Sequence, residues 1–428
     1  MLKINAERLN GRISELAKIG KIGETGVSRL AHSKEDKEAV LKVKGWMEEI
    51  GLTARIDDFG NLIGRWDAAE TADQKILMVG SHIDSQPYGG RFDGAIGVLG
   101  GLEALQTMKE NNLTPSLAIE LAAFADEEGS RFNKGLFGVR GILGRLEDGE
   151  LERKDKNGVS RKEALLEFGC NPDKFKESEY DTSRISSFLE LHIEQGPVLE
   201  DKGEAVGIVT GISGPLWLTV ELTGLAGHAG SVPMPMRQDA LVGAAKVIIK
   251  LNELVKEIPG APTVGTVGNL EVFPDSRNII PEKVTFTVDL RDIDEKRRDE
   301  IENALHRELD EVSNENGLTY NIREDTRNEP RFCSEKIMDI MRAESKEMNL
   351  QPPELMSGPF HDSLAMSYVC DYGMIFVRSK AGISHNPKEY SSPEDIALGT
   401  DLLYRTIVKM AAESTNENSR ADGRVSHE

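Results

Sequence analysis

Histidine and carboxylate residues follow two apolar segments of this sequence. His82 lies in GSHIDS, directly after the apolar run Ile76–Gly80. Glu127 and Glu128 lie in ADEEGSRF, directly after the run Leu117–Ala125. Imidazole and carboxylate together form the ligand set of Zn, Mn, Co and Ni in proteins. The pattern therefore points to metal-assisted chemistry.

Three further residues of the same kinds occupy similar places. Asp93 lies in GGRFDGAIG, His192 follows the run Phe188–Leu191, and His385 follows the run Met374–Val377. Three histidines and two or more carboxylates are enough for two ions, provided that one carboxylate bridges them. A carboxylate can do so because its two oxygens can hold ions about 3.5–4 Å apart.

Each of these residues also has an ordinary interpretation. A histidine after a strand is usually a loop residue, and an aspartate before a helix usually caps it. A Glu-Glu pair usually lies on a solvated face, but Glu127 and Glu128 follow a mostly apolar run, where unpaired charges need a partner. The joint occurrence at four strand ends favours a metal site. Adjacent glutamates also allow one to bind metal while the other acts as a base toward water.

The elements that carry these residues are typical of an α/β protein. Continuous apolar runs separated by helical stretches indicate parallel strands buried on both faces. The segment Ala95–Lys109 has a helical period and lies between the first two runs, which predicts a βαβ unit. In an open α/β sheet, ligands bind beyond the carboxyl ends of the strands. We therefore expect a mostly parallel sheet with helices on both faces and the site at one edge.

A second pattern begins near residue 211. The order strand, helix, strand, strand, helix, strand is that of the split βαβ, or ferredoxin-like, sandwich. The predicted elements are Leu216–Thr223, Gln238–Val255, Thr263–Phe273, Lys283–Leu290, Glu295–Asn314 and Thr319–Arg323. We predict a catalytic domain made of residues 1–211 and 327–413, an inserted domain over 212–326, and a disordered tail over 414–428 because that segment is polar and aperiodic.

Composition excludes several classes of function. The chain has 428 residues, with 52 Lys and Arg against 73 Asp and Glu, a net charge of −21. This charge argues against binding to nucleic acid or to an anionic membrane surface. No apolar run approaches the roughly 20 residues that span a bilayer. The three cysteines, Cys170, Cys333 and Cys370, are far apart and form no CxxC pair, so a reduced, cytoplasmic compartment is expected.

The motifs GSHIDS, GGRFDGAIG, DEEGSRF, HIEQGPVLE, GLAGHAGSVPM, DSRNIIP, VDLRD and GISHNPKEYSS together resemble the hydantoinase/carbamoylase family of binuclear amidohydrolases. That family includes N-carbamoyl-L-amino-acid hydrolases, allantoate amidohydrolases and β-ureidopropionases, and is related to the aminoacylase and carboxypeptidase G metallopeptidases. The resemblance extends to about Ala412. It implies hydrolysis of an N-carbamoyl-L-amino acid to the amino acid, ammonia and carbon dioxide. Allantoate or another ureide is the alternative substrate. An N-acyl amino acid is a weaker alternative, because the related peptidases carry an acidic residue where this chain has His192.

The resemblance also implies roles for the metal ligands. His82, Asp93 and His192 would hold one divalent ion, and Asp93, Glu128 and His385 the other, with Asp93 bridging. The ions could be Zn, Mn, Co or Ni. Glu127 would be the general acid and base, and Asp84 would orient the ring of His82.

In the resembling family, the inserted domain is a lid that dimerises and closes over the substrate. His228 would enter the site of the partner subunit and stabilise the oxyanion. Asn278 and Arg291 would bind the carboxylate of the substrate, and Gln195 would hydrogen-bond its ureido group. Gly358 would lie near the substrate.

One segment departs from the family pattern. Family members often carry small residues ahead of a His-Asp pair, where this chain has SGPFHDS. Pro359 and Phe360 replace those small residues. This departure bears on the identity of the substrate more than on the type of reaction. We expect His361 and Asp362, which match the family, to support the site rather than to bind metal.

Overall fold

The computed structural model describes residues 3–68 and 75–421, and the chain divides into two compact units. Unit 2 comprises Gly211–Phe332 and Met356–Pro359, and unit 1 comprises the rest. The predicted inserted domain, 212–326, lies within unit 2. The unit continues to Phe332 because β16 (Arg331–Phe332) pairs with Gly211 and Ile212 of β8 (Val206–Ile212).

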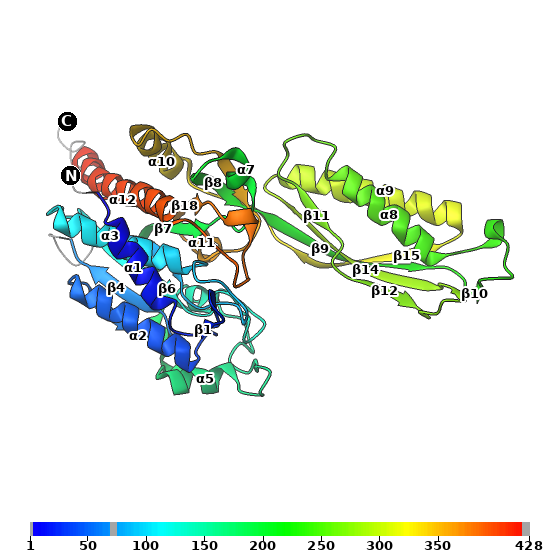
Figure 1. The fold of residues 1–428 in the computed structure, drawn as a ribbon, viewed down its shortest axis with the longest axis horizontal. Helices are drawn as coiled ribbons and strands as arrows, with labels where there is room; N and C mark the ends of the chain where they lie inside the picture. Colours follow the sequence, from blue (N-terminus) through cyan, green and yellow to red (C-terminus); the bar gives the residue numbers. More distant parts are fainter. Residues whose placement is uncertain (1–2, 69–74, 422–428) are drawn as a thin grey trace, which may run out of the picture. The chain divides into compact units, whose positions relative to one another are not determined.

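Most strands of a mixed sheet belong to unit 1 (Figure 1). The strand order of this sheet is β16-β8-β18-β7-β5-β6-β4-β3, and β17 also pairs with β8. The four predicted apolar runs lie in neighbouring strands, β6, β5, β7 and β18, which are parallel to one another. The described strands of this sheet are β3 (Thr53–Ile56), β4 (Leu62–Trp66), β5 (Ile76–His82), β6 (Ala118–Phe124), β7 (Ile185–Ile193), β8, β16, β17 (Glu354–Ser357) and β18 (Asp371–Val377).

Every residue of β5 and β6 is buried. Because successive side chains point to opposite faces, both faces of the sheet must be covered. The predicted α/β fold class, with a mostly parallel central sheet, is therefore confirmed. The helices of unit 1 are α1 (Ala6–Leu16), α2 (Lys34–Glu49), α3 (Ala95–Glu110), α4 (Phe137–Ile142), α5 (Arg161–Phe168), α6 (Phe175–Ser178), α7 (Val198–Lys202), α10 (Glu335–Glu347), α11 (Asp362–Met366) and α12 (Pro393–Ala421); a short hairpin, β1 (Lys21–Ile22) and β2 (Gly26–Val27), precedes α2.

Helix α12 continues to Ala421, past residue 414, where the sequence predicts a disordered tail to begin. No glycine or proline lies between Met410 and Ala421, so no local signal ends the helix there. The remainder of the predicted tail, 422–428, lies outside the described residues.

Unit 2 contains a sheet with the order β11-β14-β9-β15, with β12 also pairing with β14. This order, with all pairs antiparallel, is the predicted ferredoxin-like arrangement. The elements are β9 (Gly214–Thr223), β10 (Gly227–His228), α8 (Ala240–Leu254), β11 (Val264–Thr266), β12 (Leu270–Phe273), β13 (Ile279–Ile280), β14 (Lys283–Asp292), α9 (Glu295–Asn316) and β15 (Thr319–Arg327).

One predicted strand of unit 2, Thr263–Phe273, is split into β11 and β12. The residues between them include Gly268 and Asn269, which favour turns. The backbone N–H of Asn269 donates to Thr287 Oγ1 at 3.1 Å and replaces a regular ladder bond.

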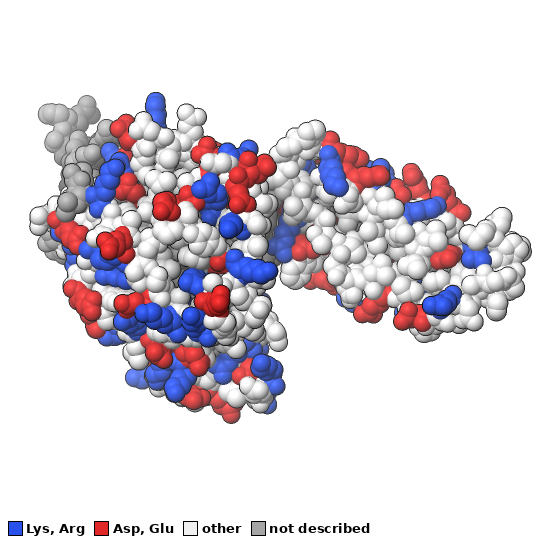
Figure 2. All heavy atoms as spheres, in the orientation of Figure 1, with Lys and Arg blue, Asp and Glu red and all other residues white. Residues whose placement is uncertain are grey.

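The helices and the surface charges bear on membrane and nucleic-acid binding. Within residues 3–68 and 75–421, no helix is both long enough and apolar enough to cross a membrane. On the face of unit 1 that Figure 2 shows, acidic and basic side chains are interspersed rather than gathered into one basic patch.

The core of unit 2 supplies a stability prediction. Leu305 of α9 is fully buried among apolar side chains of the sheet and of α8. Leu305→Ala should destabilise the protein by about 2–5 kcal/mol, because burial is lost and a cavity is left. Ile249→Ala, on the exposed side of α8, is the control and should change stability by less than about 0.5 kcal/mol. Urea denaturation monitored by circular dichroism measures both, and equal effects would contradict the assignment of the core.

Candidate metal centre

Unit 1 brings all five predicted ligands and Glu127 together at the carboxyl edge of its parallel strands. His82 is the last residue of β5 and His192 lies near the end of the neighbouring β7. Asp93 stands two residues before α3. The remaining residues, Glu127, Glu128 and His385, lie in the loops that follow β6 and β18.

A first group of potential ligand atoms surrounds one oxygen of Asp93. Its Oδ1 lies 3.1 Å from His192 Nε2 and 3.6 Å from His82 Nε2. These three residues are all buried, and their ligand atoms lie within 4.8 Å of one another. Glu127 Oε2 lies 3.7 Å from His82 Nε2.

A second group surrounds the other oxygen of Asp93. Its Oδ2 lies 3.3 Å from His385 Nε2, which lies 3.4 Å from Glu128 Oε2. Asp93 therefore presents one oxygen to each group, as a bridging carboxylate would.

The hydrogen bonds of the two buried histidines fix which ring nitrogen faces the centre. Nδ1 of His82 donates to the backbone carbonyl of Asp84 at 3.0 Å, and Nδ1 of His192 donates to its neighbour Ile193 at 2.9 Å. When the rings are neutral, each Nε2 therefore carries a lone pair, and the backbone N–H of Gly94 donates to the Nε2 of His192 at 3.2 Å. Lone pairs facing carboxylate oxygens repel one another unless a cation lies between them, so the donor set fits divalent metal ions.

Burial of several carboxylates makes the centre short of positive charge. Burial raises the pKa of Glu127 well above its usual range, and nearby carboxylates add to this against the attraction of His82. Burial and the charge of Asp93 raise the pKa of Glu128 to about 7. Burial also opposes ionisation of Asp93, but when the three histidines are protonated they donate hydrogen bonds to it, which outweigh burial and hold its pKa well below the usual range. A divalent ion would stabilise the ionised form of each carboxylate.

Asp84 supports the centre with its backbone carbonyl and with its carboxylate. Its backbone carbonyl, rather than its carboxylate, accepts the hydrogen bond from His82; the carboxylate Oδ1 lies 3.6 Å from that ring. The carboxylate instead accepts the backbone N–H groups of Glu127 and Glu128, at 3.2 and 3.3 Å. Asp84 therefore contacts both the histidine and the loop of the paired glutamates.

Gln195 also lies at the centre. Its amide nitrogen donates to Asp93 Oδ2 at 2.8 Å, and its buried Oε1 has no hydrogen-bond partner among the described residues. That oxygen is available to a ligand.

Glu389, for which no role was predicted from the sequence, is buried and holds the Asp93 loop. Its Oε1 accepts the backbone N–H groups of Phe92 and Asp93 at 2.9 and 3.1 Å, and its Oε2 accepts Ser384 Oγ at 2.9 Å. The same hydroxyl lies 3.0 Å from Asp93 Oδ2. The only sequence signal was a carboxylate four residues after His385.

A further cluster, Glu190, His192 and His361, lies behind the first group. Both oxygens of Glu190 are occupied, since they accept Ser81 Oγ at 2.8 Å and the backbone N–H of Ser363 at 2.9 Å. The ring of His361 packs edge-on against that of His192, with centroids 4.4 Å apart. This cluster supports the ring of His192.

The predicted substrate residues of unit 2 fall into two separate places. Arg291 Nη1 donates to the carbonyl of Gly358 at 2.8 Å, and Asp289 accepts the other side of the guanidinium. His228 pairs with Ile279, and the backbone of Asn278 accepts the N–H of Ala229 at 3.0 Å. His228 and Asn278 thus lie together, before the start of β14, whereas Arg291 is its ninth residue.

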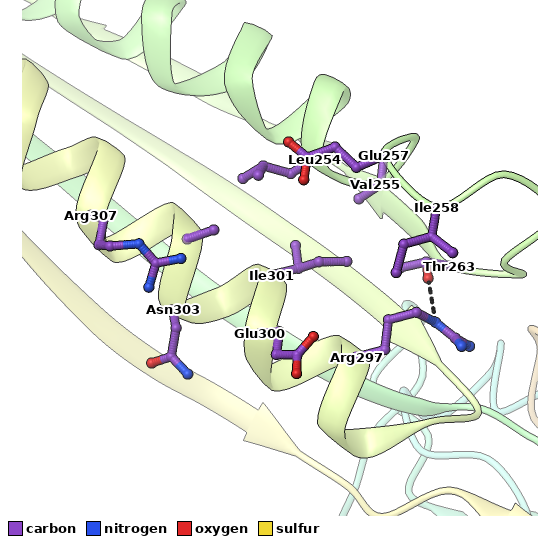
Figure 3. A pocket seen from close by; sticks show the side chains of 11 residues that line it. Leu254, Val255, Glu257, Ile258, Thr263, Arg297, Glu300, Ile301, Asn303 and Arg307 are labelled. Atoms are coloured by element: carbon purple, nitrogen blue, oxygen red, sulfur yellow. Dashed lines mark hydrogen bonds between the residues drawn. The ribbon is translucent and has the colours of Figure 1, made fainter.

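Unit 2 also contains a cavity of about 410 Å³ between the ends of α8 and α9 (Figure 3). Apolar side chains such as Leu254, Ile258 and Ile301 line it, and Arg297 at its edge donates to Thr263. None of the predicted site residues lines this cavity.

Gly94 gives a structural test of the centre. A Cβ at this position would lie 2.4–2.5 Å from three ring atoms of His82, and its φ is +61°. Gly94→Ala should displace the histidine and weaken metal binding by at least tenfold. Gly149→Ala is the matched control, because its φ is +80° and its Cβ would meet nothing within 4 Å. Metal titration by calorimetry compares them, and unchanged affinity in Gly94→Ala would contradict this geometry.

The pKa shifts give a pH test. A metal must displace protons from Glu128, whose pKa is about 7, and from His385, whose pKa the hydrogen bond to Asp93 raises to about 9. Both groups bind protons more strongly as the pH falls, so metal affinity should increase steadily from pH 6 to pH 9. Calorimetric titrations in several buffers measure this slope. A flat profile would show that these two groups do not bind the metal.

Comparison with known proteins identifies the family. Residues 78–409 match the peptidase family M20/M25/M40. The chain is 47% identical to an N-carbamoyl-L-amino-acid amidohydrolase of Pseudomonas sp. (strain NS671), over 95% of this chain and 98% of the relative. It is 33% identical to an allantoate deiminase of Arabidopsis thaliana, over 91% and 80% of the two chains. The solved structure of a hydantoinase/carbamoylase family amidase from Burkholderia multivorans matches with a TM-score of 0.87 and 33% identity, over 96% and 98% of the two chains. The chain therefore belongs to the peptidase family M20/M25/M40 and, within it, to the hydantoinase/carbamoylase amidohydrolases.

Proposed function

We propose that this hydrolase cleaves the ureido C–N bond of an N-carbamoyl-L-amino acid, giving the amino acid, ammonia and carbon dioxide. The observation that carries the proposal is the pair of ligand groups that share Asp93, with the largely buried side chain of Glu127 beside them. The 47% identity to an N-carbamoyl-L-amino-acid amidohydrolase supports the choice of substrate class.

His82, Asp93 and His192 would hold one divalent ion, and Asp93, Glu128 and His385 a second. When bound, the ions supply Lewis-acid polarisation of the carbamoyl oxygen and activation of water. Zn, Mn, Co and Ni all accept these ligands.

Glu127 performs the proton transfers in this proposal. It removes a proton from the attacking water and then delivers it to the leaving nitrogen. Its burial, with a pKa well above the usual range, suits a carboxyl that must be protonated in one step and ionised in another. The free Oε1 of Gln195 can accept a hydrogen bond from a ureido N–H.

The spacing inside unit 2 supports a homodimer. Arg291 lies eight residues along β14 from Lys283, and His228 and Asn278 lie before that strand, so roughly 27 Å of extended chain separates them. An amino-acid derivative cannot span that distance. If Arg291 binds the substrate carboxylate in its own subunit, then His228 and Asn278 must come from the partner subunit.

Allantoate is the second candidate substrate, favoured by the 33% identity to an allantoate deiminase. Ammonia release is measured with N-carbamoyl-L-methionine, its D-enantiomer and allantoate as separate substrates. N-acetyl-L-methionine is tested beside them by the release of free methionine. Together these assays separate the candidate substrates. Turnover of the L-carbamoyl compound alone is the expected result. Turnover of allantoate alone would overturn the proposed substrate but not the reaction class.

Glu127→Gln should retain two bound metal ions and lose about 10²–10⁴-fold in kcat, because the proton carrier is removed. Glu152→Gln, an exposed carboxylate of the same unit, is the control and should keep full activity. Steady-state kinetics with metal analysis checks both variants. Near-normal turnover by the metal-loaded Glu127→Gln enzyme would exclude this role.

Mixing two inactive variants tests the dimer. His228→Ala and Glu127→Gln would each be impaired alone, but a heterodimer would contain one site with an intact Glu127 and an intact partner His228. Random exchange of subunits should restore about a quarter of the wild-type rate. No recovery after verified exchange would place His228 in the site of its own subunit or outside the site.

A further inference from the structure

The loop that carries Glu127 and Glu128 is held closed by its own backbone. Three N–H groups on its return side donate to carbonyls on its outgoing side: Leu136 to Glu127 at 2.9 Å, Phe137 to Asp126 at 3.1 Å and Gly138 to Ala125 at 2.7 Å. Asp126, directly before Glu127, has a φ of 55°, in the left-handed region that non-glycine residues rarely adopt. Such a conformation persists only where the surroundings impose it.

A buried arginine contacts both sides of this loop. Arg161, the first residue of α5, has no exposed side-chain surface. Its Nη2 donates to Asp126 Oδ2 and to the backbone carbonyl of Lys134, each at 2.9 Å. One contact lies directly before Glu127, and the other lies six residues after Glu128.

The other side of the guanidinium is fixed as well. Its Nη1 pairs with the buried carboxylate of Glu150, which also pairs with Arg140. Arg140 in turn donates to the carbonyl of Gly135, at 3.1 and 3.2 Å, on the return side of the loop. The ring of Phe137 lies 4.3 Å from the guanidinium carbon.

The arrangement requires arginine rather than a general positive charge. A planar guanidinium can donate to Asp126, Lys134 and Glu150 at once because its donors form a rigid fork. A lysine ammonium is a point charge and cannot reach partners on opposite sides with the same geometry. Burying this cation among charged partners is not in itself stabilising, so stability alone does not explain it.

We propose that Arg161 is a positioning residue, which acts through Asp126 and the carbonyl of Lys134 to set the places of Glu127 and Glu128 at the metal centre. The proposal rests on the proposed function for the roles of those two glutamates. Arg161 touches none of the potential ligand atoms. Its effect passes through the loop backbone.

The test compares Arg161→Lys with Arg8→Lys in the full-length enzyme. Arg8 also forms a fork on a fully buried carboxylate, Glu103, with two contacts of 2.7 Å, but joins α1 to α3 away from the centre. Cobalt titration followed by visible absorption, thermal unfolding, kcat and KM are measured for both.

We expect Arg161→Lys to lose 10- to 100-fold in cobalt affinity and in kcat, with KM within about twofold of the wild type. Arg8→Lys should lower the unfolding temperature but leave cobalt affinity and kcat unchanged. Arg161→Lys with wild-type cobalt affinity and kcat would overturn the proposal.

Two further variants sharpen the result. The double variant Asp126→Asn/Arg161→Lys should lose less kcat than the product of the fold-losses of the two single variants, because both residues act on the same loop. If Arg161→Lys does not fold, Glu150→Gln decides, because it keeps the arginine and removes one of its charged partners. It should weaken cobalt binding several-fold, and wild-type binding would then overturn the proposal.

Cobalt binding needs no substrate, so it distinguishes this inference from the proposed function. An altered cobalt affinity in Arg161→Lys, together with a wild-type enzyme inactive on every ureide tested, would keep Arg161 as a positioning residue and reject the substrate class. The reverse pattern would reject only the role of Arg161.

Discussion

Asp93 is the point on which the rest of the centre depends. Its two carboxylate oxygens face the three histidines, and no other residue of the centre belongs to both ligand groups. A carboxylate buried in this way is stable in its ionised form only if hydrogen-bond donors or positive charges surround it. Gln195 and Ser384 donate hydrogen bonds to this carboxylate, and Gly94 allows His82 to approach closely. Glu389 holds the backbone of the same loop.

The fold explains why these groups meet although they are spread over some 300 residues of sequence. Parallel strands end at one edge of a sheet, and β5, β6, β7 and β18 lie side by side. His82 and His192 are placed by neighbouring strands, so their separation follows from strand spacing rather than from loop conformation. The glutamates and His385 are on loops, whose conformation must be fixed by additional contacts.

That difference sets the limit of what the sequence predicts. The strand ends could be recognised because apolar runs and polar residues alternate along the chain, and this pattern was enough to gather the ligand residues and Glu127. The ferredoxin-like order of unit 2 could be read in the same way. The contacts of Glu389 and Arg161 could not, because they depend on loops that fold back between distant segments. For Asp84, the contact with the His82 ring could be predicted but not the atoms that make it, since only the structure separates the backbone carbonyl from the carboxylate. The split between β11 and β12 was missed because a side chain, Thr287, replaces a ladder bond there.

Two sources of positive charge act near Glu127 and Glu128. One is the metal that the ligand groups would bind, and the other is Arg161, which we propose positions the loop. On one side Glu127, Glu128 and Asp93 gather around the histidines in an arrangement that suits divalent ions. On the other side Arg161 supplies a fixed cation to Asp126 and Glu150, within the protein interior. A metal ion can dissociate from the loop, whereas Arg161 is part of the chain. In this proposal both sources of positive charge act on the same loop. Because a bound metal stabilises only the folded state in which its ligands are gathered, the loop must already be near its final place for binding to be strong. The guanidinium fork contributes to that placement through Asp126 and the carbonyl of Lys134, neither of which belongs to the ligand groups.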